Sequence, residues 1–220
     1  MQKMINRYLI ILLTIFFAGC EDNETQMNEI EESTPGMEKY KYLCSDGGPF
    51  IVIQNSLSSK WRGHKINMAN PLDPKTDYGR ACSIKDKWGM ITVGMGTALV
   101  LADPPMISLG RSEGDKCIDI YVLQMWSNQN LDSLIDQALS GTSVDEFIDT
   151  GKLLEVDDSG LLILYAGDKV GDTIYGELNI AVNYGIYSLY KAHYRDKNVE
   201  LDIYRLRKRD AQQVNKMTKP

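Results

Sequence analysis

The feature that most limits the fold of this chain is a series of short apolar runs separated by turn-forming residues. Between residues 117 and 126 the side chains of Ile118, Ile120 and Val122 alternate with those of the opposite face, which is the period-two pattern of a β-strand. Further strand-like runs are found at 50–53, 88–103, 161–166, 173–182, 186–194 and 199–206. Turns are expected at 94–96, inside the second of these runs, and at 157–160, 183–185 and 196–198, the last two as hairpin-like turns.

Two short helices are predicted between these strands. In 130–141 the apolar residues recur at helical spacing, Asn130 can cap the start and Gly141 can end the helix. In 143–151 Ser143 and Glu146 form a capping box, with Gly151 as the stop. The order of strands, helices and further strands predicts an α+β fold, mainly an antiparallel β-sheet, either curved or closed into a partial barrel, with both helices on one side.

The N-terminus reads as a bacterial lipoprotein signal peptide. Lys3 and Arg7 precede the uncharged run 8–18, which is shorter than the ~20 residues of a membrane span. The run ends in Phe-Ala-Gly-Cys, which resembles a lipobox, so cleavage is expected after Gly19 and acylation at Cys20. We therefore expect a lipid-attached, periplasm-facing protein of the cell envelope, and Glu21 weakly favours the outer over the inner membrane.

The net charge of the chain is carried by the segment that follows. The whole chain has 24 basic and 30 acidic residues, a net charge of −6. Residues 21–38 contain seven acids and no Lys, Arg or aromatic residue, so they are expected to form a disordered tether. Residues 39–220 keep 22 basic and 23 acidic residues, which provides no broad basic face for nucleic acid. The expected organisation is a signal peptide at 1–19, an acylated tether at 20–38, one domain at 39–209 and a flexible polar tail at 210–220.

One stretch could carry catalysis. Asp77-Tyr78-Gly79-Arg80-Ala81-Cys82 places an acid, a phenol, a guanidinium and a thiol close together. If 78–84 is a strand, Tyr78, Arg80 and Cys82 share one face. A nucleophilic thiol usually needs a nearby His or a helix N-terminus, and His64 and His193 are distant in sequence. The alternative is that Cys82 is a small buried apolar residue beside an Arg80 ion pair.

Other residues present weaker signals. Trp61 and Trp88 are candidate interface anchors, although a core position is at least as plausible for Trp61. The Gly47-Gly48-Pro49 segment is interpreted as backbone geometry at the entry to a strand, because no helix N-terminus follows to bind a phosphate. No zinc or calcium spacing is present, so no metal or other cofactor is expected.

Four local patterns in order resemble the immunity protein 21 family, whose members are predicted to protect bacteria from polymorphic toxins encoded next to them. These patterns are 45–53, 61–63, 77–82 and 94–105, and the resemblance spans roughly 43–207. It marks a set of motif residues, structural or interfacial in role: Gly47, Gly48, Pro49, Trp61, Gly63, Asp77, Tyr78, Arg80, Ala81 and Cys82. The chain departs from the family pattern in its lipoprotein N-terminus and in two additional cysteines, Cys44 and Cys117.

The resemblance implies a binding protein without a catalytic task. Because the extra cysteines arrive as a pair, we hypothesise a Cys44–Cys117 disulfide with Cys82 as a buried thiol. The expected function is binding and neutralisation of a cognate toxin of a polymorphic, contact-dependent or type VI-like system in the envelope. The expected partners are that toxin and the membrane, with no nucleic acid or small-molecule substrate. An accessory envelope lipoprotein and a thiol-dependent enzyme remain the alternatives, and direct contact of 77–82 with the toxin stays open.

Overall fold

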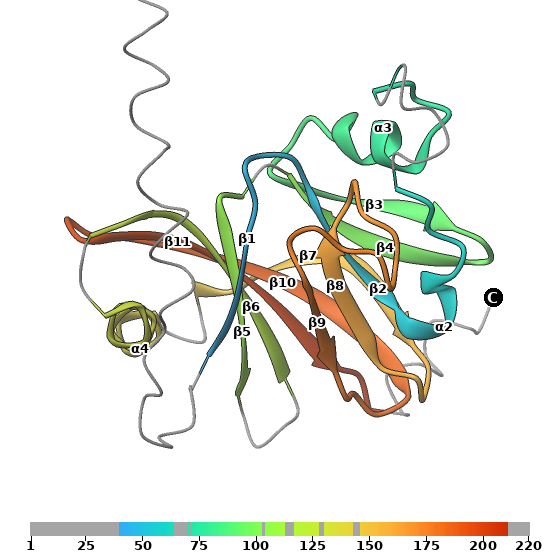
Figure 1. Cartoon of the computed structure of the whole chain (residues 1–220). Coiled ribbons are helices and arrows are strands. Elements are labelled where there is room, and N and C mark those ends of the chain that lie inside the picture. Colours follow the sequence, from blue (N-terminus) through green and yellow to red (C-terminus); the bar gives the residue numbers. More distant parts are fainter. Residues whose placement is uncertain are drawn as a thin grey trace, which may run out of the picture. The chain divides into compact units, whose positions relative to one another are not determined.

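The computed structural model describes residues 40–63, 70, 72–102, 104–112, 117–127, 130–142 and 146–210, without the side chains of 111 and 112. These residues form two antiparallel β-sheets of six and five strands with three short helices (Figure 1). The predicted signal peptide, the tether and all of the C-terminal tail after Asp210 lie outside the described residues. Within the described ranges, no helix has both the length and the apolar character needed to span a bilayer.

The six-stranded sheet combines strands from both ends of the chain. Its strands, in spatial order, are β1 (Lys41–Cys44), β5 (Met106–Ser112), β6 (Cys117–Trp126), β11 (Val199–Lys208), β10 (Gly185–Arg195) and β7 (Ile148–Val156). The predicted turn at 196–198 is confirmed as the β10–β11 hairpin, where Asp196 Oδ1 accepts hydrogen bonds from the backbone N–H groups of Asn198 and Val199.

The five-stranded sheet consists of β3 (Trp88–Val93), β4 (Gly96–Leu101), β2 (Phe50–Gln54), β8 (Leu161–Tyr165) and β9 (Glu177–Ile180), in that order. The predicted hairpin at 94–96 is confirmed between β3 and β4, and Gly94 takes the positive φ that the tight turn requires. The three helices are α2 (Asn55–Ser58), α3 (Asp77–Cys82) and α4 (Leu131–Gly141).

The two sheets face each other and share the main core. In β2, Phe50 and Val52 point into this core, whereas Ile51 and Ile53 point to a second core on the outer face of the five-stranded sheet. Because both faces of β2 are covered, its sequence is apolar without alternation. The expectation of mainly antiparallel sheet is confirmed, but the curved single sheet or partial barrel is replaced by two facing sheets, since the strands divide into two hydrogen-bonded sets.

Helix α4 covers the outer face of the six-stranded sheet. Leu134, Ile135 and Ala138 pack there, and Asn130 caps the helix as predicted by accepting a hydrogen bond from Ser133 N at 3.1 Å. On the other side of the molecule, the segment with α2 and α3 covers the outer face of the five-stranded sheet (Figure 1). The two predicted helices therefore do not share one side of a sheet, because only α4 forms as expected.

Three local predictions are wrong. Residues 77–82 form helix α3 rather than part of a strand, because Thr76 caps them. Residues 148–151 belong to strand β7 rather than to a helix, and Gly151 occupies a bulge opposite Leu189 and Tyr190 at φ 67°. Ser143 lies outside the described residues. The segment 183–185 joins strands of different sheets, so it is no hairpin.

Candidate functional site

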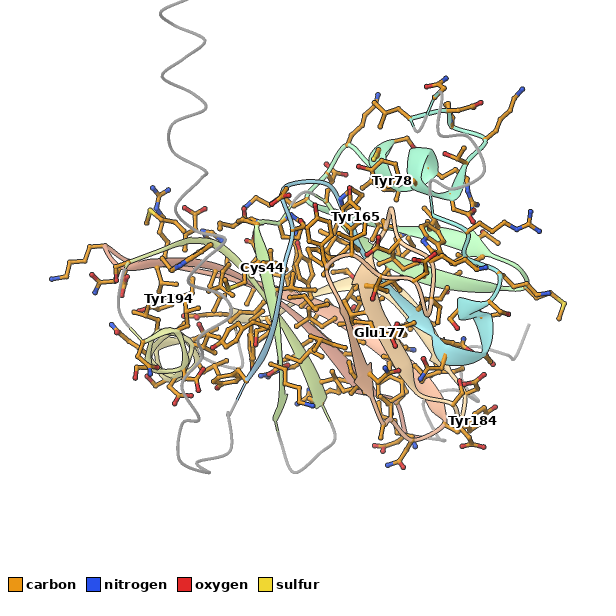
Figure 2. All side chains as sticks on the ribbon, viewed as in Figure 1. Cys44, Tyr78, Tyr165, Glu177, Tyr184 and Tyr194 are labelled. Atoms are coloured by element: carbon orange, nitrogen blue, oxygen red, sulfur yellow. The ribbon has the colours of Figure 1, made fainter. Side chains whose placement is uncertain are left out.

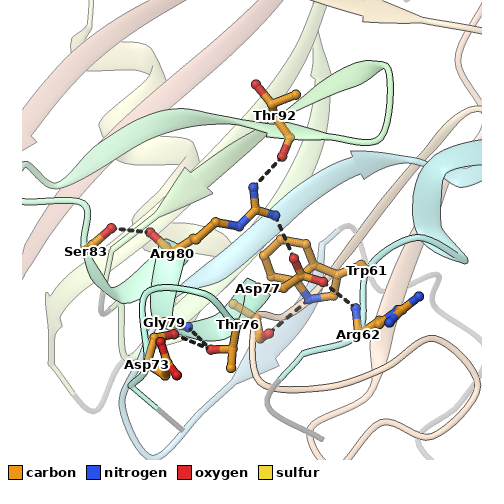
Figure 3. Close-up of polar contacts among 10 residues, drawn as sticks. Trp61, Arg62, Asp73, Thr76, Asp77, Gly79, Arg80, Ser83 and Thr92 are labelled. Atoms are coloured by element: carbon orange, nitrogen blue, oxygen red, sulfur yellow. Dashed lines mark hydrogen bonds and ion pairs between the residues drawn. The ribbon is translucent and has the colours of Figure 1, made fainter. Parts of the chain in front are cut away.

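The family-motif residues 61–63 and 77–82, together called the signature unit below, meet on the outer face of the five-stranded sheet (Figure 3). Asp77 connects the two segments. Its Oδ2 accepts a hydrogen bond from Arg62 N at 2.8 Å, and its Oδ1 accepts from Arg80 Nη2 at 2.6 Å. Arg80 also donates from Nη1 to the carbonyl oxygen of Thr92 in β3 at 2.8 Å. The unit thus ties a loop, a helix and an edge strand together.

Helix α3 exists because of local capping and close backbone packing. Thr76 Oγ1 accepts from Gly79 N at 2.9 Å, which satisfies an N-terminal amide of the helix. Gly79 lets the helix approach the preceding turn, since a Cβ there would lie 2.1 Å from the carbonyl oxygen of Asp73. Strand alternation predicted the wrong set of side chains for each face of 77–82, because this segment has the helical period and not a period of two.

Trp61 is a core residue. Its side chain is fully buried, and its Nε1 donates to the carbonyl oxygen of Ala166 at 3.0 Å. The interface-anchor reading of Trp61 is therefore wrong, whereas Trp88 is half-buried at the edge of the sheet.

The Gly47-Gly48-Pro49 segment has the backbone role predicted for it. Gly47 and Gly48 have φ values of 117° and 97°, and a Cβ on Gly48 would lie 2.9 Å from the Tyr78 and Tyr165 hydroxyls. These hydroxyls are hydrogen-bonded at 2.9 Å, and Figure 2 labels both residues. Burial, followed by the hydrogen bonds to Tyr165 and Cys82, raises the pKa of Tyr78 well above its usual value, so this phenol stays protonated at physiological pH.

The surroundings of Cys82 do not support nucleophilic catalysis. The residue is half-buried at the last position of α3, the end of the helix where the dipole does not favour a thiolate. The Arg80 guanidinium is engaged by Asp77 and Thr92. His193 is bonded to Asp202 in the other sheet, and His64 lies outside the described residues.

The hypothesised Cys44–Cys117 disulfide is incompatible with the strand register. Cys44 is opposite Met106 at the start of β5, and Cys117 is opposite Ser112 at its end. Six residues along a strand correspond to ~20 Å, whereas bridged Cα atoms lie roughly 4.4–6.8 Å apart. Cys44, Cys82 and Cys117 are all in the thiol form, with Cys44 exposed and Cys117 buried.

A cleft opens between the two sheets beside β3, and it is our candidate functional site. Its volume is about 880 Å³. One wall is the N-terminal half of β3, and the other is the inner face of β7, β10 and β11. The lining residues are Asp86, Lys87, Trp88, Gly89, Met90, Glu146, Ile148, Lys152, Lys191, Ala192, His193, Asp202 and Tyr204.

Asp202 organises the polar part of the cleft. Its Oδ2 accepts from Lys87 Nζ at 2.8 Å and from Gln124 Nε2 at 3.1 Å, and its Oδ1 lies 2.7 Å from His193 Nδ1. The carboxylate side chain is only 11% exposed, so these partners offset the cost of its burial. Burial, followed by the charge of Asp202, raises the pKa of Tyr204, which keeps its phenol protonated.

The remaining lining combines apolar groups with two lysines and two acids, Asp86 and Glu146. The rings of Trp88 and Tyr204 lie 6.3 Å apart across the cleft, and Ile148 is 62% exposed. Lys152 and Lys191 are exposed and form no ion pair with any residue in the described ranges. An apolar floor next to ammonium groups is suited to binding a partner rather than to chemistry.

The sequence reasoning missed this cleft, although a signal was present. Along β10 the side chains of one face are Tyr187, Leu189, Lys191 and His193, so the face changes from apolar to basic partway along the strand. Such a change marks the point where a core ends and a hydrated opening begins. The pattern along β10 does not specify which strand of the five-stranded sheet faces this opening.

Metal chemistry has no support in this part of the chain. The described residues contain no group of three or more His, Cys, Asp or Glu side chains placed to hold a metal ion.

Comparison with known proteins gave one result. The family model described as immunity protein 21 matches residues 41–198, which includes the signature unit and most strands of both sheets. No curated protein and no solved structure matches the chain.

Proposed function

Because the chain belongs to the immunity protein 21 family, we propose that it is a lipid-anchored immunity protein that binds and neutralises one toxin in the bacterial cell envelope. The family match is the observation that carries this proposal. The family implies a non-enzymatic inhibitor of a cognate toxin. The envelope location, the lipid anchor and the type of toxin system are the steps that we add.

The N-terminal sequence supports the envelope location. The basic start, the short apolar run and the Ala18-Gly19-Cys20 ending favour cleavage before Cys20 and acylation of this residue, with palmitate as one of the attached acyl chains. The acidic segment 21–38 would reach ~60 Å when fully stretched, so the domain can work at a distance from the lipid surface. Glu21 in place of Asp favours the outer membrane.

The location limits the class of toxin. An inhibitor held outside the cytoplasm suits a polymorphic toxin that is delivered by contact-dependent or type VI-like secretion and acts in the periplasm. Wall hydrolases, lipases and pore-forming proteins are such toxins. Anchoring raises the local concentration of the inhibitor near the membrane, which favours rapid capture of an arriving toxin.

A competition experiment tests the function. Cells lacking this gene are mixed with toxin-producing sister cells and counted over time, with the toxin gene next to this one deleted in a control attacker. We expect the deletion strain to be killed only by the toxin-producing attacker and to be rescued by the intact gene. Equal survival of the deletion strain and the parent would reject the immunity function.

A second experiment tests the anchor. Cys20→Ser should abolish palmitate labelling and move the protein out of the membrane fraction, and it should reduce protection without changing toxin binding in vitro. Cys44→Ser is the matched control, since it removes an exposed thiol from the folded domain. Membrane retention of the Cys20→Ser protein would contradict lipid anchoring while leaving the immunity function standing.

A further inference from the structure

The cleft between the sheets is bordered by a strand whose outer edge has no neighbour among the strands that the structure describes. β3 is the terminal strand of the five-stranded sheet, and β4 is its only partner among the described strands. Such an edge presents backbone N–H and C=O groups that another chain can pair with. Native proteins that leave such an edge uncovered often use it to bind an extended segment.

The pairing pattern shows which groups face outward. Ala102 N donates to Lys87 O at 2.9 Å, so Lys87 and Ala102 form a hydrogen-bonded pair and the pattern alternates from there. Gly89 and Ile91 therefore bond to β4, whereas the backbone groups of Trp88, Met90 and Thr92 point to the open edge. The Arg80 guanidinium already occupies Thr92 O, which leaves Trp88 and Met90 for a partner.

Trp88 and Met90 also line the cleft. Trp88 and Met90 pack their side chains against the main core, so their side of β3 is the one that faces the six-stranded sheet. A strand added beside β3 would direct every second side chain the same way, into the cleft. There it would meet Ile148, which is largely exposed, and the ammonium groups of Lys152 and Lys191.

Lys152 and Lys191 favour an acidic group in the occupant. Lys191 is opposite Ile148 across the β7–β10 pair, and Lys152 is opposite Leu189, two residues further along β10. The two ammonium groups therefore come from neighbouring positions on one face. Lys87 differs from them because it is paired with Asp202. An inserted acidic side chain would give Lys152 and Lys191 the partner that the described residues do not provide.

We propose that the cognate toxin is held by an extended segment that pairs with Trp88 and Met90 of β3 and inserts alternating acidic and apolar side chains into the cleft. This proposal rests on the immunity function. The acidic side chain binds Lys152 and Lys191, and the apolar side chain covers Ile148 and the Trp88 ring. The interaction adds a sixth strand to the five-stranded sheet.

Charge reversal tests the side-chain part. The probe is the inactivated toxin domain encoded beside this gene, and the full chain is used in detergent. We expect the double variant Lys152→Glu, Lys191→Glu to weaken toxin binding at least 100-fold, mainly through faster dissociation, with an unchanged thermal transition. The control variant Lys60→Glu, Lys169→Glu reverses two exposed lysines outside the cleft and should change binding less than threefold.

Hydrogen exchange tests the backbone part. In the free protein the amides of Trp88 and Met90 should exchange faster than those of Gly89 and Ile91, and toxin should slow the first pair specifically. Failure of the wild-type chain to bind the toxin counts against the immunity function itself. Tight binding with no effect of the cleft variant and no protection at Trp88 and Met90 would overturn this site alone. Protection that depends on protein concentration without toxin would overturn it in favour of pairing between two copies.

Discussion

The packing of Gly63 predicts a large loss of stability from the addition of one methyl group. Gly63 has a φ of 58°, and a Cβ there would lie 2.3 Å from the carbonyl oxygen of Gly167 and 2.6 Å from that of Asp168. Both obstructing atoms belong to the backbone of the turn after β8, so no side chain can rotate away. Gly94 is a matched control with a φ of 59°, where a Cβ would lie 3.6 Å from the Lys60 side chain.

The two sites separate backbone strain from steric overlap. Left-handed φ costs a non-glycine residue about 1–2 kcal/mol, and the loss of chain entropy in the unfolded state offsets about 0.4–1 kcal/mol. Gly94→Ala should therefore destabilise the domain by about 0–1.5 kcal/mol. Gly63→Ala bears the same strain plus an overpacking cost of about 1–3 kcal/mol, for a total of about 1–4.5 kcal/mol.

Thermal and urea unfolding of the chain starting at Glu21 measure this difference. At about 2–4 °C per kcal/mol for a domain of this size, Gly63→Ala should unfold about 2–12 °C below Gly94→Ala, with the same urea m-value. If the two variants lose the same stability, the close approach between Gly63 and the 166–168 turn does not exist, and the signature unit does not stabilise the fold through this contact.

Three further predictions concern charges and thiols. Asp119→Asn should destabilise the domain by about 3–5 kcal/mol in urea unfolding, because it leaves Arg205 buried without its two carboxylate contacts at 2.7 and 2.8 Å. The double variant Asp119→Leu, Arg205→Met should recover much of this loss. Hydrogen bonds from Asn198 N and Val199 N lower the pKa of Asp196. The stabilisation that Asp196 provides is therefore complete above its unfolded pKa of about 4 and is lost as pH falls through the lower folded pKa. In Asp196→Asn the free energy of unfolding should fall less steeply with decreasing pH below about pH 4, and an unchanged slope would contradict this linkage. Native alkylation followed by mass mapping should modify Cys44 and spare Cys117 until denaturant is added, whereas a peptide pair linked through these two cysteines would contradict the strand register.

Strands were easier to predict from the sequence than their partners. The run at 117–126 and the hairpin turns at 94–96 and 196–198 depend on local alternation and turn chemistry, and all three are confirmed. The division into two sheets depends on contacts between residues far apart in sequence, such as Phe50 with Leu101 and with Tyr165. Nothing in a local period specifies these contacts.

The errors at α3 and β7 have a local cause. For six residues such as 77–82, alternation and helical spacing make nearly the same pattern, and the cap that decides the outcome is Thr76, just before them. At 148–151 the capping box favoured a helix, but pairing with β10 makes this segment a strand, with Thr150 and Gly151 left unpaired in a bulge. Tertiary contacts outweighed local propensity there.

The signature unit acts on the proposed toxin site from a distance. Arg80 donates a hydrogen bond to Thr92 O of β3, and the Ile84 side chain packs where a Cβ of Gly89 would be. The signature unit and Ile84 therefore set the position of β3, the strand that borders the cleft. Arg80→Met should therefore weaken toxin binding, by about tenfold, although Arg80 does not line the cleft. When Arg80→Met is combined with Lys152→Glu and Lys191→Glu, it should weaken toxin binding less than it does alone. The reason is that a displaced β3 no longer holds the toxin segment next to the two lysines. Full additivity in a double-mutant cycle would show that the brace and the cleft act independently, and that the signature of the family stabilises the fold without shaping the surface that meets the toxin.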